Sequence, residues 1–131
     1  MSLESPPARR ILIVDDERGV RALCTDILQR GGYEAEAVDS AWAALDRIDA
    51  AHFDLALVDI NMPAMSGIEL CRRLRERRPD LPVVLITGCP TIESAVRGIG
   101  SGATDYVCKP FTPEALREAV ARVLHPAPYS P

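Results

Sequence analysis

Short, unbroken apolar runs alternate along this chain with longer stretches in which apolar residues recur at every third or fourth position. Residues 11–14, 55–58 and 83–86 are continuous apolar runs, a pattern typical of strands that are buried on both faces of a parallel sheet. Residues 35–38 and 106–107 are weaker strand segments, suited to the edges of the sheet. The pattern therefore predicts five strands.

Five amphipathic stretches follow the strands, with apolar positions at helical spacing. They cover residues 20–28, 41–48, 67–74, 92–99 and 113–124. Ser40 and Ser66 are suited to the N-cap position, and Thr112 precedes a proline at the first helical position. Gly31-Gly32 ends the first helix. Five strand–helix repeats predict the α/β class, a doubly wound parallel sheet with helices on both faces.

Polar side chains follow four of the predicted strands, at the edge where this architecture binds its ligands. The first strand is followed by Asp15, Asp16 and Glu17, the third by Asp59 and Asn61, the fourth by Thr87-Gly88, and the fifth by Lys109. If the second strand lies outside the first, the first, third and fourth strands are neighbours. Three carboxylates would then converge in one crevice, with a hydroxyl and an ammonium group opposite.

Clustered carboxylates repel one another unless a cation compensates them or their pKa values rise. Carboxylate oxygens suit Mg²⁺, which takes few protein ligands and keeps several waters. A metal beside an aspartate nucleophile is suited to phosphoryl chemistry. Each acidic residue taken alone also fits a solvated turn or a helix N-cap, so only their combination indicates a site.

Chain length, hydropathy and net charge limit the classes of function that the chain can have. The 131 residues fit one domain, which is predicted over residues 10–125. Residues 1–9 form an N-terminal extension that could partly be a cloning remnant, and residues 126–131 form a Pro-rich tail or the start of a linker. No apolar run approaches the ~20 residues that a bilayer crossing needs. The net charge of −4 argues against direct nucleic-acid binding. The arginine-rich run at 72–78 is interpreted as a solvated helix face.

The four cysteines are scattered without a C-x-x-C pair, and we see no export signal. Reduced thiols in a cytoplasmic protein are the simplest interpretation.

Four segments together carry a family resemblance: residues 13–17, 58–63, 86–88 and 105–111. In this order, each at a strand end, they resemble the receiver (response regulator) family of two-component signalling. The resemblance implies a flavodoxin-like, five-stranded sheet with strand order 2-1-3-4-5. It also implies that the chain is a phosphorylation-dependent switch and not an enzyme beyond its own phosphotransfer and autodephosphorylation.

The resemblance assigns a role to each matching residue. Asp59 would accept the phosphoryl group, with Mg²⁺ held by Asp15, Asp16, Asp59 and the backbone carbonyl of Asn61. Thr87 and Lys109 would bind the phosphoryl oxygens, and Gly88 would leave room for them. Tyr106 would change rotamer as Thr87 moves, and Cys89 would tune attack by water.

The implied partners are a sensor histidine kinase or phosphotransfer protein, and an output domain or downstream protein that contacts the face formed by the fourth helix, fifth strand and fifth helix. Homodimerisation stays open. Two alternatives remain. A haloacid-dehalogenase-like Mg²⁺ phosphatase also uses an aspartate nucleophile, but its motif has a second aspartate where this chain has Asn61. The other is a receiver-like binding module that is never phosphorylated.

Overall fold

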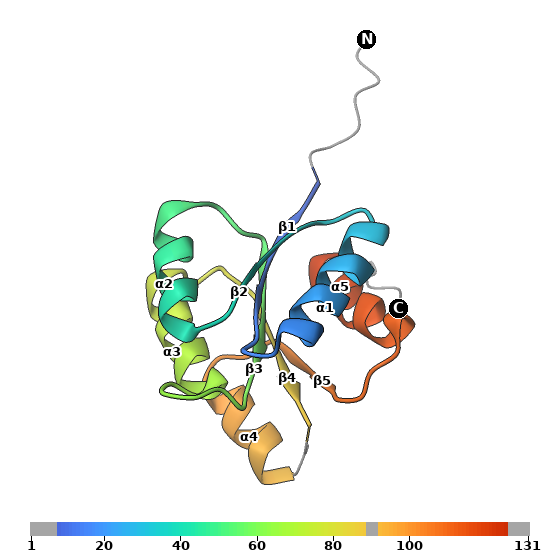
Figure 1. The fold of residues 1–131 in the computed structure, drawn as a ribbon. Helices are drawn as coiled ribbons and strands as arrows, with labels where there is room; N and C mark the ends of the chain where they lie inside the picture. The colour runs from blue at the N-terminus through green and yellow to red at the C-terminus, as the bar shows by residue number, and fades with distance from the viewer. Residues whose placement is uncertain (1–7, 89–91, 126–131) are drawn as a thin grey trace, which may run out of the picture.

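The computed structural model describes residues 8–88 and 92–125, and of residues 92–95 only the backbone. It contains one five-stranded parallel sheet with the order β2-β1-β3-β4-β5, and helices cover both faces of the sheet (Figure 1). The elements follow one another as β1 Arg10–Val14, α1 Arg18–Arg30, β2 Glu34–Val38, α2 Ala41–Ala50, β3 Leu55–Asp59, α3 Gly67–Arg77, β4 Val83–Thr87, α4 Ile92–Gly100, β5 Asp105–Cys108 and α5 Pro113–Leu124. The predicted fold class and strand order are confirmed.

The third, fourth and fifth strands each end one residue later than the apolar pattern indicates, and for β5 that last residue is Cys108. Asp59 is the last residue of β3 and Thr87 the last of β4, whereas the sequence placed both just after a strand. The sheet ladder explains the difference, because Asp59 pairs with Ile86 and Thr87 pairs with Cys108. Both polar side chains therefore stand on regular backbone rather than on loops.

The core consists of two layers, because alternate residues of each strand face opposite sides of the sheet. On β1, Leu12 and Val14 belong to the layer beneath α2 and α3, while Ile11 and Ile13 belong to the layer beneath α1 and α5. In the first layer, α4 lies against β4, since a Cβ added to Gly98 would come within 2.8 Å of Leu85. Packing on both faces makes the central strands a rigid support for their carboxyl ends.

Three helix starts follow the predicted capping chemistry. The side-chain oxygens of Ser40, Ser66 and Thr112 accept hydrogen bonds from backbone N–H groups three residues further on. The capping box that begins at Ser66 is incomplete, because the Glu69 carboxylate pairs with Arg72 and Arg73 and not with the backbone of Ser66. In the described part of the chain, no helix has both the length and the apolar character to cross a bilayer.

Candidate functional site

Two buried carboxylates and one lysine meet at the carboxyl edge of the sheet. Asp15 is fully buried and Asp59 is 2% exposed. The Lys109 ammonium lies 3.3 Å from Oδ2 of Asp15 and 3.7 Å from Oδ1 of Asp59. These residues follow or end β1, β3 and β5, so the sheet brings together side chains that are up to 94 positions apart in the sequence. Lys109 is thus the shared counter-ion of two carboxylates.

The loop after β1 adds two exposed carboxyl groups to this pair. One carboxylate oxygen from each of Asp15, Asp16 and Glu17 lies within 4.8 Å of the others. The Glu17 carboxylate also approaches the Lys109 ammonium, at 3.7 Å. The loop is held by a hydrogen bond from the Glu17 N–H to Oδ1 of Asp15 (2.8 Å) and by one from Arg21 Nη1 to the Asp15 carbonyl (2.9 Å). Three carboxyl groups therefore lie within 3.7 Å of the Lys109 ammonium, and that of Asp16 lies beside two of them.

Asp59 is fixed by the turn that follows it. The Asn61 N–H donates to Oδ1 of Asp59 at 3.3 Å, and the Gly67 N–H donates to the Ile60 carbonyl at 2.9 Å. A Cβ on Gly67 would lie only 2.1 Å from the Asp59 carbonyl oxygen. Only glycine therefore lets α3 begin against the end of β3.

The electrostatics of the site disfavour a charged Asp59. Burial, followed by the negative charge of Asp15, raises the pKa of Asp59 to about 6, although Lys109 acts in the opposite direction. Burial acts to lower the pKa of Lys109, but Asp59 and Asp15 outweigh burial and raise it. The neighbouring Cys24 thiol has its pKa raised to about 12 by burial and then by Asp15, so it stays protonated. The pocket therefore has an excess of negative charge.

The donor set fits a hard divalent cation. The compact group formed by Asp15, Asp16 and Glu17 offers carboxylate oxygens, which are ligands that Mg²⁺ prefers. One ammonium does not balance four carboxyl groups, so an added cation would relieve the repulsion that raises the pKa of Asp59. Asp15 and Asp16 are the predicted ligands within the compact group, and Asp59 is joined to Asp15 through Lys109.

Thr87 and Gly88 lie at the same edge. Thr87 is 4% exposed, and its carbonyl accepts a hydrogen bond of 2.7 Å from the Lys109 N–H. Among the residues that the structure describes, apart from its chain neighbours, none would come within 4 Å of a Cβ on Gly88.

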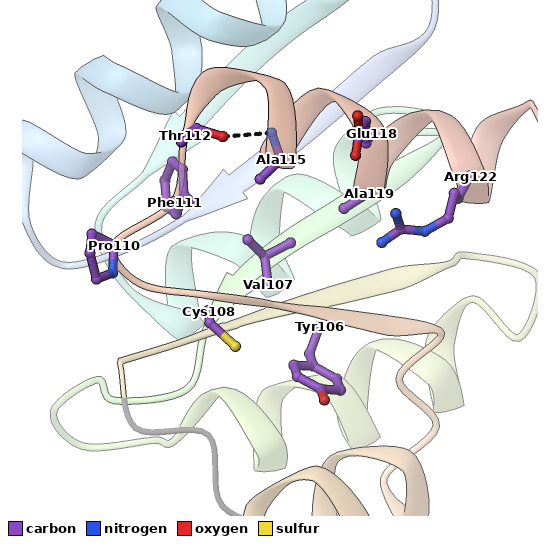
Figure 2. A pocket seen from close by; sticks show the side chains of 10 residues that line it. All are labelled: Tyr106, Val107, Cys108, Pro110, Phe111, Thr112, Ala115, Glu118, Ala119 and Arg122. Carbon is purple, nitrogen blue, oxygen red and sulfur yellow. Dashed lines mark hydrogen bonds between the residues drawn. The ribbon is translucent and has the colours of Figure 1, made fainter.

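Tyr106 lies further from this edge, on β5. Tyr106 and Cys108 project from one side of β5, and Val107 projects from the other, towards α5 (Figure 2). Tyr106 is 41% exposed. Cys89 falls outside the described residues.

Two residues near the predicted site were not assigned a role from the sequence. Glu17 completes the acidic group and contacts Lys109. In the sequence, the position of Glu17 directly after Asp16 was the signal that could have indicated this role. Arg21 holds the loop from α1, and nothing in the local sequence marks an arginine that donates to a backbone carbonyl.

Comparisons with known proteins identify the family to which the fold belongs. Residues 11–121 match the family described as the response regulator receiver domain. The response regulator protein FleR of Pseudomonas aeruginosa is 44% identical over 88% of this chain, and the response regulator MprA of Mycolicibacterium vanbaalenii is 40% identical over 87%. The matches cover 24% and 48% of those relatives, so the chain spans about a quarter of the length of one and about half of the other.

Solved structures show the same fold. The chemotaxis protein CheY4 of Vibrio cholerae superposes with a TM-score of 0.87 at 33% identity, over 90% of this chain and 100% of that one. A receiver domain protein from Methanospirillum hungatei gives a TM-score of 0.86 at 36% identity, over 90% and 94%. The fold and the family match define a receiver domain of two-component response regulators. This chain belongs to the response regulator receiver domain family.

Proposed function

We propose that Asp59 is the phosphoacceptor of a signalling switch that is loaded from a phosphohistidine of a sensor kinase or phosphotransfer protein. The observation that carries this proposal is the buried Asp59 carboxylate sharing Lys109 with Asp15 at the carboxyl edge of the sheet. A structural salt bridge would need one acid per lysine. Here the second acid leaves negative charge that favours a cation and, with it, the oxygens of a phosphoryl group.

Asp15, Asp16 and Asp59, with the Asn61 carbonyl, would hold Mg²⁺. When bound, the ion neutralises charge on the phosphoryl oxygens. The chain's own residues supply the rest of the chemistry. An ionised Asp59 oxygen attacks phosphorus, a P–O bond forms, and the P–N bond of the donor breaks with its electron pair returning to the imidazole. Lys109 stays within reach of Asp59 and pairs with the transferred group, and Thr87 donates its hydroxyl to it.

Phosphorylation would shift the fold between two states. Attraction of Thr87 and Lys109 towards the new oxygens pulls on β4 and β5, since the Lys109 N–H is hydrogen-bonded to the Thr87 carbonyl. The shift requires the phosphoryl group to interact better with one state than with the other. The exposed ring of Tyr106 would follow Thr87 inward.

The surface formed by α4, β5 and α5 is the proposed output face. Val96 and Ile99 on α4 and Tyr106 on β5 are exposed apolar side chains. Next to Tyr106, a pocket of about 350 Å³ lies between β5 and α5, and Glu118 and Arg122 are among its lining residues (Figure 2). A downstream protein, an output domain or a second copy of the chain would cover this face when the switch is on.

Incubation with acetyl phosphate, with and without Mg²⁺, followed by intact-mass measurement, tests the proposal. We expect the protein to gain one phosphoryl group with Mg²⁺ and none with EDTA or in Asp59→Asn. The exposed Asp46 on α2 provides the control, since Asp46→Asn should gain the group as the unaltered protein does. A chain that never gains the group acts as a non-phosphorylated binding module, and sustained release of inorganic phosphate from an added phosphomonoester would indicate a phosphatase instead.

A further inference from the structure

Arg21 makes an unusual contact for a residue in the first turns of α1. Its guanidinium Nη1 donates a hydrogen bond of 2.9 Å to the backbone carbonyl of Asp15, the first residue after β1. Its own N–H donates to the Glu17 carbonyl at 3.0 Å. Arg21 therefore spans the whole loop that carries Asp15, Asp16 and Glu17, and it is partly buried in doing so.

This contact affects Asp16 through the backbone, although the hydrogen bond itself is made to Asp15. The Asp16 side chain is exposed and makes no hydrogen bond within residues 8–88 and 92–125, so its position depends on its backbone. The peptide before Asp16 is planar, so fixing the Asp15 carbonyl also fixes the Asp16 nitrogen. The peptide after Asp16 is held through the Glu17 N–H, which donates to the Asp15 carboxylate.

The two tethers differ in one important way. The tether on the Glu17 side uses the Asp15 carboxylate, which also pairs with Lys109 and is a candidate ligand. The Arg21 tether uses only a backbone carbonyl, so it can persist whether or not the carboxylates are engaged. We infer that Arg21 is a positioning residue that holds the loop so that Asp15 and Asp16 present their carboxylates together to a divalent cation. This inference rests on the proposed function of the site.

The guanidinium also carries a positive charge, which by itself would weaken cation binding. The tether should strengthen Mg²⁺ binding and the charge should weaken it, and a matched control variant separates these two effects. Arg18, one turn earlier on the same helix, is exposed and makes no hydrogen bond or ion pair with any residue that the structure describes. Arg18→Ala removes the same charge without removing a tether, so its Mg²⁺ affinity should be unchanged or slightly higher.

Calorimetric titration of Mg²⁺ into the whole chain, without any phosphoryl donor, measures the effect directly. We expect Arg21→Ala to bind Mg²⁺ about tenfold more weakly than the unaltered protein, since residues that orient metal ligands typically contribute ~10–100-fold to affinity. Arg21→Lys, which keeps the charge and one donor group, should be intermediate. At saturating Mg²⁺, the maximal rate of phosphorylation by acetyl phosphate should change by less than about twofold, because the ligands themselves are intact.

Thermal unfolding in EDTA distinguishes a structural role of Arg21 from a role in positioning the metal ligands. A purely structural role would lower the melting temperature of Arg21→Ala and leave the Mg²⁺ affinity of the folded protein equal to that of Arg18→Ala, which would overturn the inference. If Arg21→Ala does not fold, Arg21→Lys and Arg18→Lys form the comparison, and equal affinities again refute a positioning role. If the unaltered protein binds no Mg²⁺, the proposed function and this inference fail together. If it binds Mg²⁺ and Arg21→Ala binds equally well, only the inference fails.

Discussion

Replacing Asp59 by asparagine should stabilise the metal-free protein. The substitution keeps the size of the side chain and removes a charge that burial and Asp15 disfavour. The pKa of Asp59 rises from 3.8 to about 6, and at ~1.4 kcal/mol per pKa unit this corresponds to an upper limit of about 3 kcal/mol. Lys109 loses one of its two buried partners in the variant, so a net gain of about 1–2 kcal/mol is expected near neutral pH.

The pH dependence gives the sharper test, and its sign follows from the raised pKa. A group whose pKa is higher in the folded state favours folding fully below its unfolded pKa, and this contribution is lost as pH rises through the folded pKa. Asp59 therefore makes the metal-free protein lose stability between about pH 4 and pH 6. Urea unfolding in EDTA across this range should show this decline for the unaltered protein and for Asp46→Asn, and a smaller decline for Asp59→Asn. Equal declines in all three proteins would refute the account of a crowded, partly neutralised pocket.

Three further changes test other parts of the structure. Lys109→Met should abolish detectable phosphorylation by acetyl phosphate. Because it removes the counter-ion of two buried carboxylates, it should also destabilise the metal-free fold by about 1–3 kcal/mol at neutral pH, as measured by urea unfolding. Unchanged stability would contradict the shared ion pair. Gly67→Ala should cost more than about 2 kcal/mol, because its Cβ would lie 2.1 Å from the Asp59 carbonyl oxygen. Gly19→Ala is its control, because no described residue outside the adjoining backbone of α1 lies within 4 Å of the added Cβ. This exchange should be neutral or stabilise α1 by up to ~1 kcal/mol. Mg²⁺ should raise the melting temperature of the unaltered protein relative to EDTA and have little effect on Asp16→Ala; an equal rise in both would remove Asp16 from the ligand set.

The sheet was predictable because burial on both faces leaves a strong sequence signal. The β1, β3 and β4 runs have no polar interruption, and every residue of β3 and β4 is buried. The edge strand β2 reads Glu-Ala-Glu-Ala-Val and is only partly buried, so its signal was weaker. The caps at Ser40, Ser66 and Thr112 were equally readable, because one side chain and one nearby N–H suffice.

The sequence predicted that Asp15, Asp59 and Lys109 would lie together, but it could not predict how they pair. Parallel strands put Asp15, Asp59 and Lys109 at one edge, which pattern and topology alone indicate. That one lysine serves two buried acids depends on side-chain directions and distances. The Arg21 contact ends on a backbone carbonyl, which every residue has, so no residue type at position 15 could indicate it. Asp59 and Thr87 were placed one residue outside their strands because the apolar run stops before the ladder does.

The central claim is that Asp59, and no other acid of this crowded edge, forms the acyl phosphate. Hydroxylamine tests this most directly, since it attacks the acyl carbonyl, releases phosphate and leaves a stable hydroxamate on the phosphorylated residue. After incubation with acetyl phosphate and Mg²⁺, peptide sequencing by mass spectrometry should find the hydroxamate on Asp59 alone, and on no residue when EDTA replaces Mg²⁺. A hydroxamate on Asp15 or Asp16, or none in the presence of Mg²⁺, would contradict the account.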